Sequence, residues 1–265
     1  MKYKLAHDAR PQAKTLLFAA ALSVALWFIP FAEILSYPFR IFVTFIHEGG
    51  HALAALMTGN SVLSLSVSTN GAGETYTTQG GALSQMFVSS AGYLGAMAFG
   101  AVILVLIRRA AAAKIILFVC AFLILFLTFV FGFIKPIFAG PAGSWSSVPF
   151  TFIAGVVISL GLYAIGRWTS ERVALFIVSM IAVQCILNAL LDLKTVFFLS
   201  SPFAPSVPND ALNMANVTGV PAIFWATLWI ALAFGILLLA LRFYVALRER
   251  GFDKQKDLPF EEKIA

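Results

Sequence analysis

Apolar stretches of about 20 residues recur along this chain, and they limit its possible folds more than any other feature. Helices of roughly that length cross a hydrocarbon core, because each satisfies its backbone polar groups within its own segment. Charged residues make up only 11% of the chain and hydrophobic residues 60%, which excludes an ordinary soluble domain. The sequence therefore predicts an all-α, polytopic membrane protein, a bundle of six or seven transmembrane helices. The apolar stretches are 14–36, 38–58, 82–107, 115–134, 150–168, 172–199 and 219–247.

Basic residues gather near the two ends of the chain. Such clusters beside apolar helices typically face anionic lipid headgroups. A nucleic-acid partner is not expected, because no aromatic-lined groove accompanies the basic residues. We expect a polar basic segment over 1–13, one transmembrane domain over 14–247 and a charged tail over 248–265. The predicted location is a cell membrane, either a plasma membrane or a bacterial inner membrane. The basic residues are Lys2, Lys4, Arg10 and Lys14, and then Arg242, Arg248, Arg250, Lys254, Lys256 and Lys263.

Residues 61–79 differ from the apolar runs around them. Leu63, Leu65 and Val67 alternate with serines, which is the two-residue period of a strand. A turn at 70–73 and a second β-prone run at 75–78 follow. An exposed backbone edge cannot face lipid, so the predicted β-hairpin must be sheltered by protein, lie at the surface or pair with another strand.

The segment 47–51, His-Glu-Gly-Gly-His, matches the pattern H-E-x-x-H. On a helix, His47 and His51 lie one above the other, so both can reach one metal ion. Glu48 projects beside that position, where it can act as a general base on water. Ionisable groups are costly within an apolar helix, so a metal site is favoured over a structural polar cluster. The ligand type indicates zinc.

Gly49 and Gly50 weaken this helix, because glycine costs about 1 kcal/mol relative to alanine in a helix interior. Two explanations are open. The glycines can leave room for a substrate backbone, or they can allow another helix to pack closely.

A catalytic zinc usually has three protein ligands and one open position. The carboxylates between the second histidine and the basic tail are Glu74, Glu171, Asp192 and Asp210. Only Asp192 lies within an apolar run, where it ends a polar stripe with Gln184 and Asn188 at four-residue spacing. We therefore expect Asp192 as the third ligand, with Asp210 as the alternative. Asn188 is a candidate catalytic group that orients a ligand or stabilises an oxyanion.

Three segments together resemble the site-2 protease family of intramembrane zinc metalloproteases, in particular its divergent, membrane-embedded branch. They are the H-E-G-G-H of 47–51, Asn-Ala-Leu-Leu-Asp at 188–192 and Ala-Gly-Tyr-Leu-Gly at 91–95. The resemblance implies that a downstream aspartate completes the zinc site, that a glutamate activates water and that a hairpin presents the substrate. These roles would fall on Asp192, Glu48 and residues 61–79. The usual family motif places proline between Asn and Asp and glycine after Asp, whereas Leu193 follows Asp192, so Asp210 stays as the alternative acid.

Two functions are compatible with these features. The first is a zinc metalloprotease that cuts a peptide bond in or near a transmembrane segment of another membrane protein. The second is a non-catalytic scaffold or a small-solute transporter that retains a metal site. Glu48 favours the protease, because a scaffold does not require that residue. The expected partners are a membrane-protein substrate and the lipid bilayer, and no oligomeric state follows from the sequence.

Overall fold

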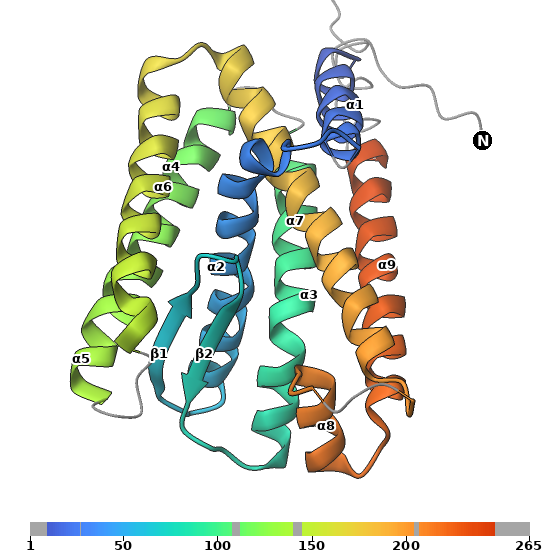
Figure 1. Cartoon of the computed structure of the whole chain (residues 1–265). Coiled ribbons are helices and arrows are strands. Elements are labelled where there is room, and N and C mark those ends of the chain that lie inside the picture. Colours follow the sequence, from blue (N-terminus) through green and yellow to red (C-terminus); the bar gives the residue numbers. More distant parts are fainter. Residues whose placement is uncertain (1–9, 27, 108–111, 140–144, 204–206, 247–265) are drawn as a thin grey trace, which may run out of the picture.

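The computed structural model describes residues 10–26, 28–107, 112–139, 145–203 and 207–246. Helices dominate it (Figure 1). Residues 1–9 of the predicted basic segment 1–13 lie outside the described residues, as does the whole predicted tail 248–265. The helices are α1 (Arg10–Ala25), α2 (Glu33–Met57), α3 (Ala82–Leu106), α4 (Ala113–Phe126), α5 (Lys135–Ala139), α6 (Val148–Trp168), α7 (Glu171–Leu199), α8 (Asp210–Thr218) and α9 (Ala222–Ala246).

Within the described residues, five helices are long and apolar enough to cross a membrane. They are α3, α6, α7, most of α9, and the continuous unit of α4, a π-helical segment (Leu127–Ile134) and α5. The helix α2 is 25 residues long, but its histidines and charged residues make it less apolar. The helix α1 is a shorter apolar helix. The predicted polytopic helical bundle is confirmed, and the number of spans is near the six or seven expected.

The outer faces of the bundle carry large apolar side chains. On α6, Ile153 and Val157 are more than half exposed, and Leu238 and Leu239 on α9 are similarly exposed. Such continuous apolar surface is rare on soluble monomers, but it is the normal contact surface with lipid. The exposure pattern therefore agrees with a bundle that is embedded in a bilayer.

The helices α2 and α3 lie at the centre of the bundle (Figure 1). The pair α4 and α6 packs on one side, and α7 and α9 pack against α3 on the other. The crossing of α2 and α3 is close, since a Cβ atom at Gly50 would overlap the carbonyl oxygen of Ala91. Of the two explanations for the glycine pair, the structure shows close helix packing at Gly50.

The two strands β1 (Val62–Val67) and β2 (Gly73–Thr77) form an antiparallel hairpin, as predicted for residues 61–79. The register pairs Val67 with Gly73 and Leu65 with Thr75, with an irregularity at Leu63. The free edge of β1 is covered by α6, where the Thr151 hydroxyl accepts the N–H of Val67 at 2.8 Å. Protein therefore shelters this edge of the hairpin.

Candidate metal centre

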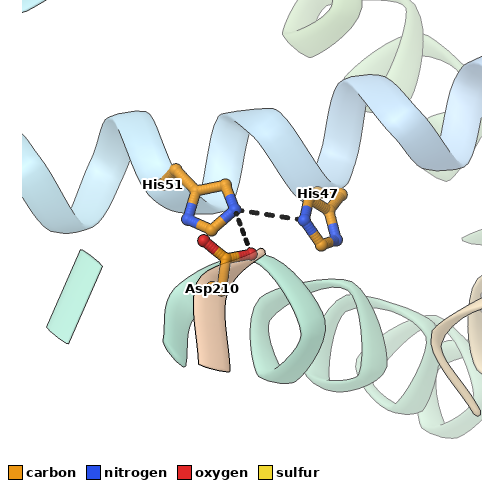
Figure 2. Close-up of side chains that lie close together, drawn as sticks. All are labelled: His47, His51 and Asp210. Atoms are coloured by element: carbon orange, nitrogen blue, oxygen red, sulfur yellow. Dashed lines mark hydrogen bonds and ion pairs between the residues drawn. The ribbon is translucent and has the colours of Figure 1, made fainter. Parts of the chain in front are cut away.

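His47, His51 and Asp210 place their side chains around one point (Figure 2). The two Nε2 atoms lie 3.1 Å apart, and Nε2 of His51 lies 3.6 Å from Oδ2 of Asp210. All three potential ligand atoms are within 4.8 Å of one another. Tetrahedral zinc ligands at about 2.0–2.2 Å from the metal lie roughly 3.3–3.5 Å apart, so the separations of 3.1 Å and 3.6 Å are close to those around a single metal ion, and the widest separation would shorten when an ion binds.

Two helices supply these three side chains. The histidines come from adjacent turns of α2, as the four-residue spacing predicts. Asp210 is the first residue of α8, and Asn209 caps that helix by accepting the N–H of Leu212 at 3.0 Å. Because a capped first turn has a fixed direction, Asn209 holds Asp210 in place beneath the histidines.

Asp210, and not Asp192, joins the histidines, which departs from the expectation for the third ligand. Asp192 lies on α7 and interacts electrostatically with both Arg40 and Tyr93, but it is not in the group of described side chains that could hold a metal ion. Arg40 precedes His47 on α2 by two helical turns, about 10 Å along the axis. Asp210 reaches the histidines because α8 packs against α3. This packing brings the first residue of α8, which follows a Pro-containing segment, to the metal position.

Asn188 makes its hydrogen bonds within α7. Its side-chain amide donates to the backbone oxygen of Gln184 at 2.8 Å and to the Gln184 side-chain oxygen at 3.0 Å. Within the described residues, the buried side-chain nitrogen of Gln184 has no hydrogen-bond partner, so the polar stripe on α7 is only partly satisfied within the helix. Asn188 is not among the residues that line the cleft at the candidate metal centre, and its catalytic role stays a prediction.

The remaining nitrogen of His51 has a backbone partner. Nδ1 of His51 donates to the carbonyl oxygen of Val88 at 2.6 Å. A donated Nδ1–H fixes the tautomer, which leaves the lone pair of Nε2 available to a metal. The backbone of α3 thus orients one of the two histidine ligands.

Tyr93 contacts two of the three candidate ligands. Its ring meets the His47 ring edge-on, with centroids 4.6 Å apart, and its hydroxyl donates to the Asp210 carboxylate. Trp229 of α9 is buried and also packs against Tyr93, with ring centroids 5.6 Å apart. Burial raises the pKa of Asp210, whereas the neighbouring His51 and the Tyr93 hydroxyl oppose that change by stabilising the carboxylate. The sequence patterns gave Tyr93 no such role; its one signal was a hydroxyl within an apolar helix.

Gly92 is the point at which α3 approaches the metal position. A Cβ atom at this residue would overlap Nε2 of both His47 and His51. The absence of a side chain at Gly92 therefore leaves room beside the two nitrogen atoms for an ion.

Glu48 is buried under the hairpin, with only 4% of its surface exposed. The Thr75 hydroxyl donates to Oε2 of Glu48 at 2.7 Å. Gly73 packs so closely that a Cβ atom there would lie 2.6 Å from Cγ of Glu48. The strand β2 therefore fixes the carboxylate next to the histidine pair, where the sequence motif predicted it.

A cleft of about 720 Å³ opens from the candidate metal centre between β2, α8 and the beginning of α3. The N–H of Val67 bonds to Thr151 and not to β2, so Val67 and its partner Gly73 form a non-hydrogen-bonded pair of the hairpin. In such a pair, the backbone N–H and C=O of both residues point away from the opposite strand. By the same alternation, the backbone groups of Thr75 and Thr77 point outward along this edge. The cleft is thus bordered on one side by a strand edge with backbone groups free to pair.

We expect Tyr93→Phe to weaken zinc affinity by about 10- to 100-fold, because an outer hydrogen bond to a metal ligand typically has an effect of that size. The change removes only the hydroxyl that binds Asp210 and keeps the ring against His47. Competition with a chromogenic chelator measures the affinity. Tyr163→Phe on α6 is the matched control, since Tyr163 is half exposed and contacts Phe118 instead. Equal affinities in the two variants would show that the Tyr93 hydroxyl does not hold Asp210 for the metal.

A family model described as Peptidase M50B-like matches residues 16–240. The match includes α2, the hairpin, α3 and α8, which together contain the candidate ligands and Glu48. No curated protein and no solved structure shows significant similarity to the chain. The chain therefore belongs to the Peptidase M50B-like family, a site-2 protease family, and it is a multi-pass integral membrane protein.

Proposed function

We propose that this protein is an intramembrane zinc metalloprotease that hydrolyses a peptide bond in or near a transmembrane segment of another membrane protein. One observation carries the proposal: His47, His51 and Asp210 converge beside a buried Glu48 at the base of a cleft. Membership in a peptidase family supports the same activity class.

The proposed ion is zinc. Two imidazole nitrogens and one carboxylate oxygen, with one open position, form a typical catalytic zinc site. The two facing Nε2 atoms, the nearby Asp210 and the space beside Gly92 all fit such an ion. When bound, zinc would supply a Lewis acid that polarises the carbonyl of the scissile peptide bond.

Glu48 is the proposed general base. Its carboxylate would take a proton from the attacking water and then deliver that proton to the leaving amine. The hydrogen bond from Thr75 holds the carboxylate in one orientation without supplying a positive charge that would quench its basicity. Asp210 serves as a ligand in this scheme, so the two carboxylates have separate roles.

The free edge of β2 is the proposed place for the substrate. A helical substrate hides its peptide carbonyls in intrahelical hydrogen bonds, so it must unwind locally before hydrolysis. A segment added to β2 as a strand would regain backbone partners at Thr75 and Thr77. Since Thr75 also binds Glu48, a strand at this position lies next to the proposed general base.

The test of this function is Glu48→Gln. We expect hydrolysis to fall by at least about 100-fold, because an amide cannot accept the proton from water. The assay uses liposomes with a fluorogenic single-span peptide that carries a glycine-rich, weakly helical segment. Bound zinc and the unfolding temperature should stay unchanged. Glu171→Gln, at the exposed start of α7, should retain full turnover. Equal turnover by Glu48→Gln and the natural chain would favour the scaffold or transporter alternative.

A further inference from the structure

The face of α8 that borders the cleft carries two asparagines. Asn213 and Asn216 are both exposed and line the cleft with Asp210. Their spacing of three residues makes Asn213 a neighbour of both Asp210 and Asn216 on the helix surface. They lie about 4.5 Å and 9 Å beyond Asp210 along the helix axis. They therefore line a part of the cleft that is farther from the candidate metal centre than Asp210 is.

The side-chain amides of these two residues are free. Within the described part of the chain, neither Asn213 nor Asn216 has a hydrogen-bond partner for its side chain. Asn209 differs, because its oxygen accepts the N–H of Leu212 and its nitrogen donates to the carbonyl oxygen of Val207 at 2.8 Å. Asn209 therefore has a structural role in capping α8, whereas the other two amides are available to a ligand.

A strand has two hydrogen-bonding edges, and β2 can satisfy only one edge of a bound segment. The second edge of that segment would face across the cleft toward α8, which lines the cleft together with β2. A peptide group that is buried without a partner costs free energy comparable to a lost hydrogen bond. An asparagine amide has both a donor and an acceptor, so it can pair with either backbone group.

We propose that Asn213 and Asn216 bind the outer backbone edge of the unwound substrate, which is then held as a strand between β2 and α8. This inference rests on the proposed function, and it adds a recognition mode to it. The substrate is selected for a segment that unwinds and exposes both backbone edges. Its side-chain sequence matters less, because both walls of the cleft contact the main chain.

Binding to a catalytically silent protein tests this inference separately from hydrolysis. The probe is a fluorescent single-span peptide with a glycine-rich segment, titrated against the Glu48→Gln protein in phosphatidylcholine liposomes. We expect Asn213→Ala with Asn216→Ala to raise Kd about 10-fold or more, since two peptide-type hydrogen bonds are lost. The paired Asn→Gln variants keep the amides and should bind within about threefold of the Glu48→Gln protein. Thr227→Ala, at an exposed position of α9, is the control for removal of a polar side chain elsewhere.

A change in the peptide backbone provides the second arm. When an ester replaces one backbone N–H that faces α8, the Glu48→Gln protein should lose affinity while the double alanine variant does not. Unchanged binding after both asparagines are removed would overturn the role of α8 alone. Intact binding without Glu48-dependent hydrolysis by the natural chain would overturn the proposed protease function alone. Absence of peptide binding to the Glu48→Gln protein would overturn the inference about α8 directly.

Discussion

Purified Asp210→Ala protein is expected to bind zinc at least about 100-fold more weakly than the natural chain, whereas Asp192→Ala should bind it normally. The reason is geometric, because Oδ2 of Asp210 lies 3.6 Å from Nε2 of His51 while Asp192 interacts with Arg40. Metal analysis of detergent-purified protein, after dialysis against a zinc buffer, measures the difference.

The control for this experiment is His51→Ala, which should lose zinc as Asp210→Ala does. Unfolding temperatures in the presence of a chelator separate loss of a ligand from loss of the fold. If Asp192→Ala lost the metal and Asp210→Ala kept it, the ligand set proposed from the structure would be refuted. Asp192, which the sequence favoured, would then be the third ligand.

Replacement of Gly92 by alanine is expected to abolish zinc binding and hydrolysis through a single methyl group. The added Cβ would overlap Nε2 of both His47 and His51, so the rings must move or the space for the ion is lost. Alanine is otherwise favoured over glycine in a helix by about 1 kcal/mol. We therefore expect metal affinity to fall without a matching loss of helix stability.

Gly95→Ala provides the matched control on the same helix. A Cβ atom at Gly95 would meet Gly50 Cα at 3.6 Å, which is an ordinary van der Waals contact. This variant should keep its zinc and its turnover. The comparison uses zinc affinity, turnover of the fluorogenic single-span peptide and unfolding temperature for both variants. Similar zinc affinities in Gly92→Ala and Gly95→Ala would show that α3 does not define the metal position.

The sequence predicted the features that depend on local pattern. Apolar runs of sufficient length identified the helical bundle, and the alternation of Leu63, Leu65 and Val67 identified the first strand. The spacing of His47 and His51 placed both side chains on one face of α2, which the structure shows. Each of these features arises within one element, so no knowledge of tertiary packing was needed.

The third member of the cluster depends on tertiary structure, and local pattern favoured a different residue. Burial in an apolar helix pointed to Asp192, but proximity to the histidines depends on how α8 folds back against α3. One local signal did exist, since Asn209 before Asp210 is a favourable N-cap and an acidic residue is favourable in the first helical turn. That signal predicts a helix start at Asp210 within the Pro-rich segment. It does not predict which helix α8 packs against.

The covered edge of β1 has a consequence for how the hairpin associates with other chains. Open strand edges commonly lead to edge-to-edge aggregation, and here Thr151 of α6 closes one of the two. The other edge, on β2, borders the cleft that α8 also lines, so we expect a further strand to pair there. If the substrate binds as proposed, one added strand would occupy this edge of the hairpin. A cleaved segment that stays paired with β2 would block the next one, so turnover would depend on how fast that strand dissociates.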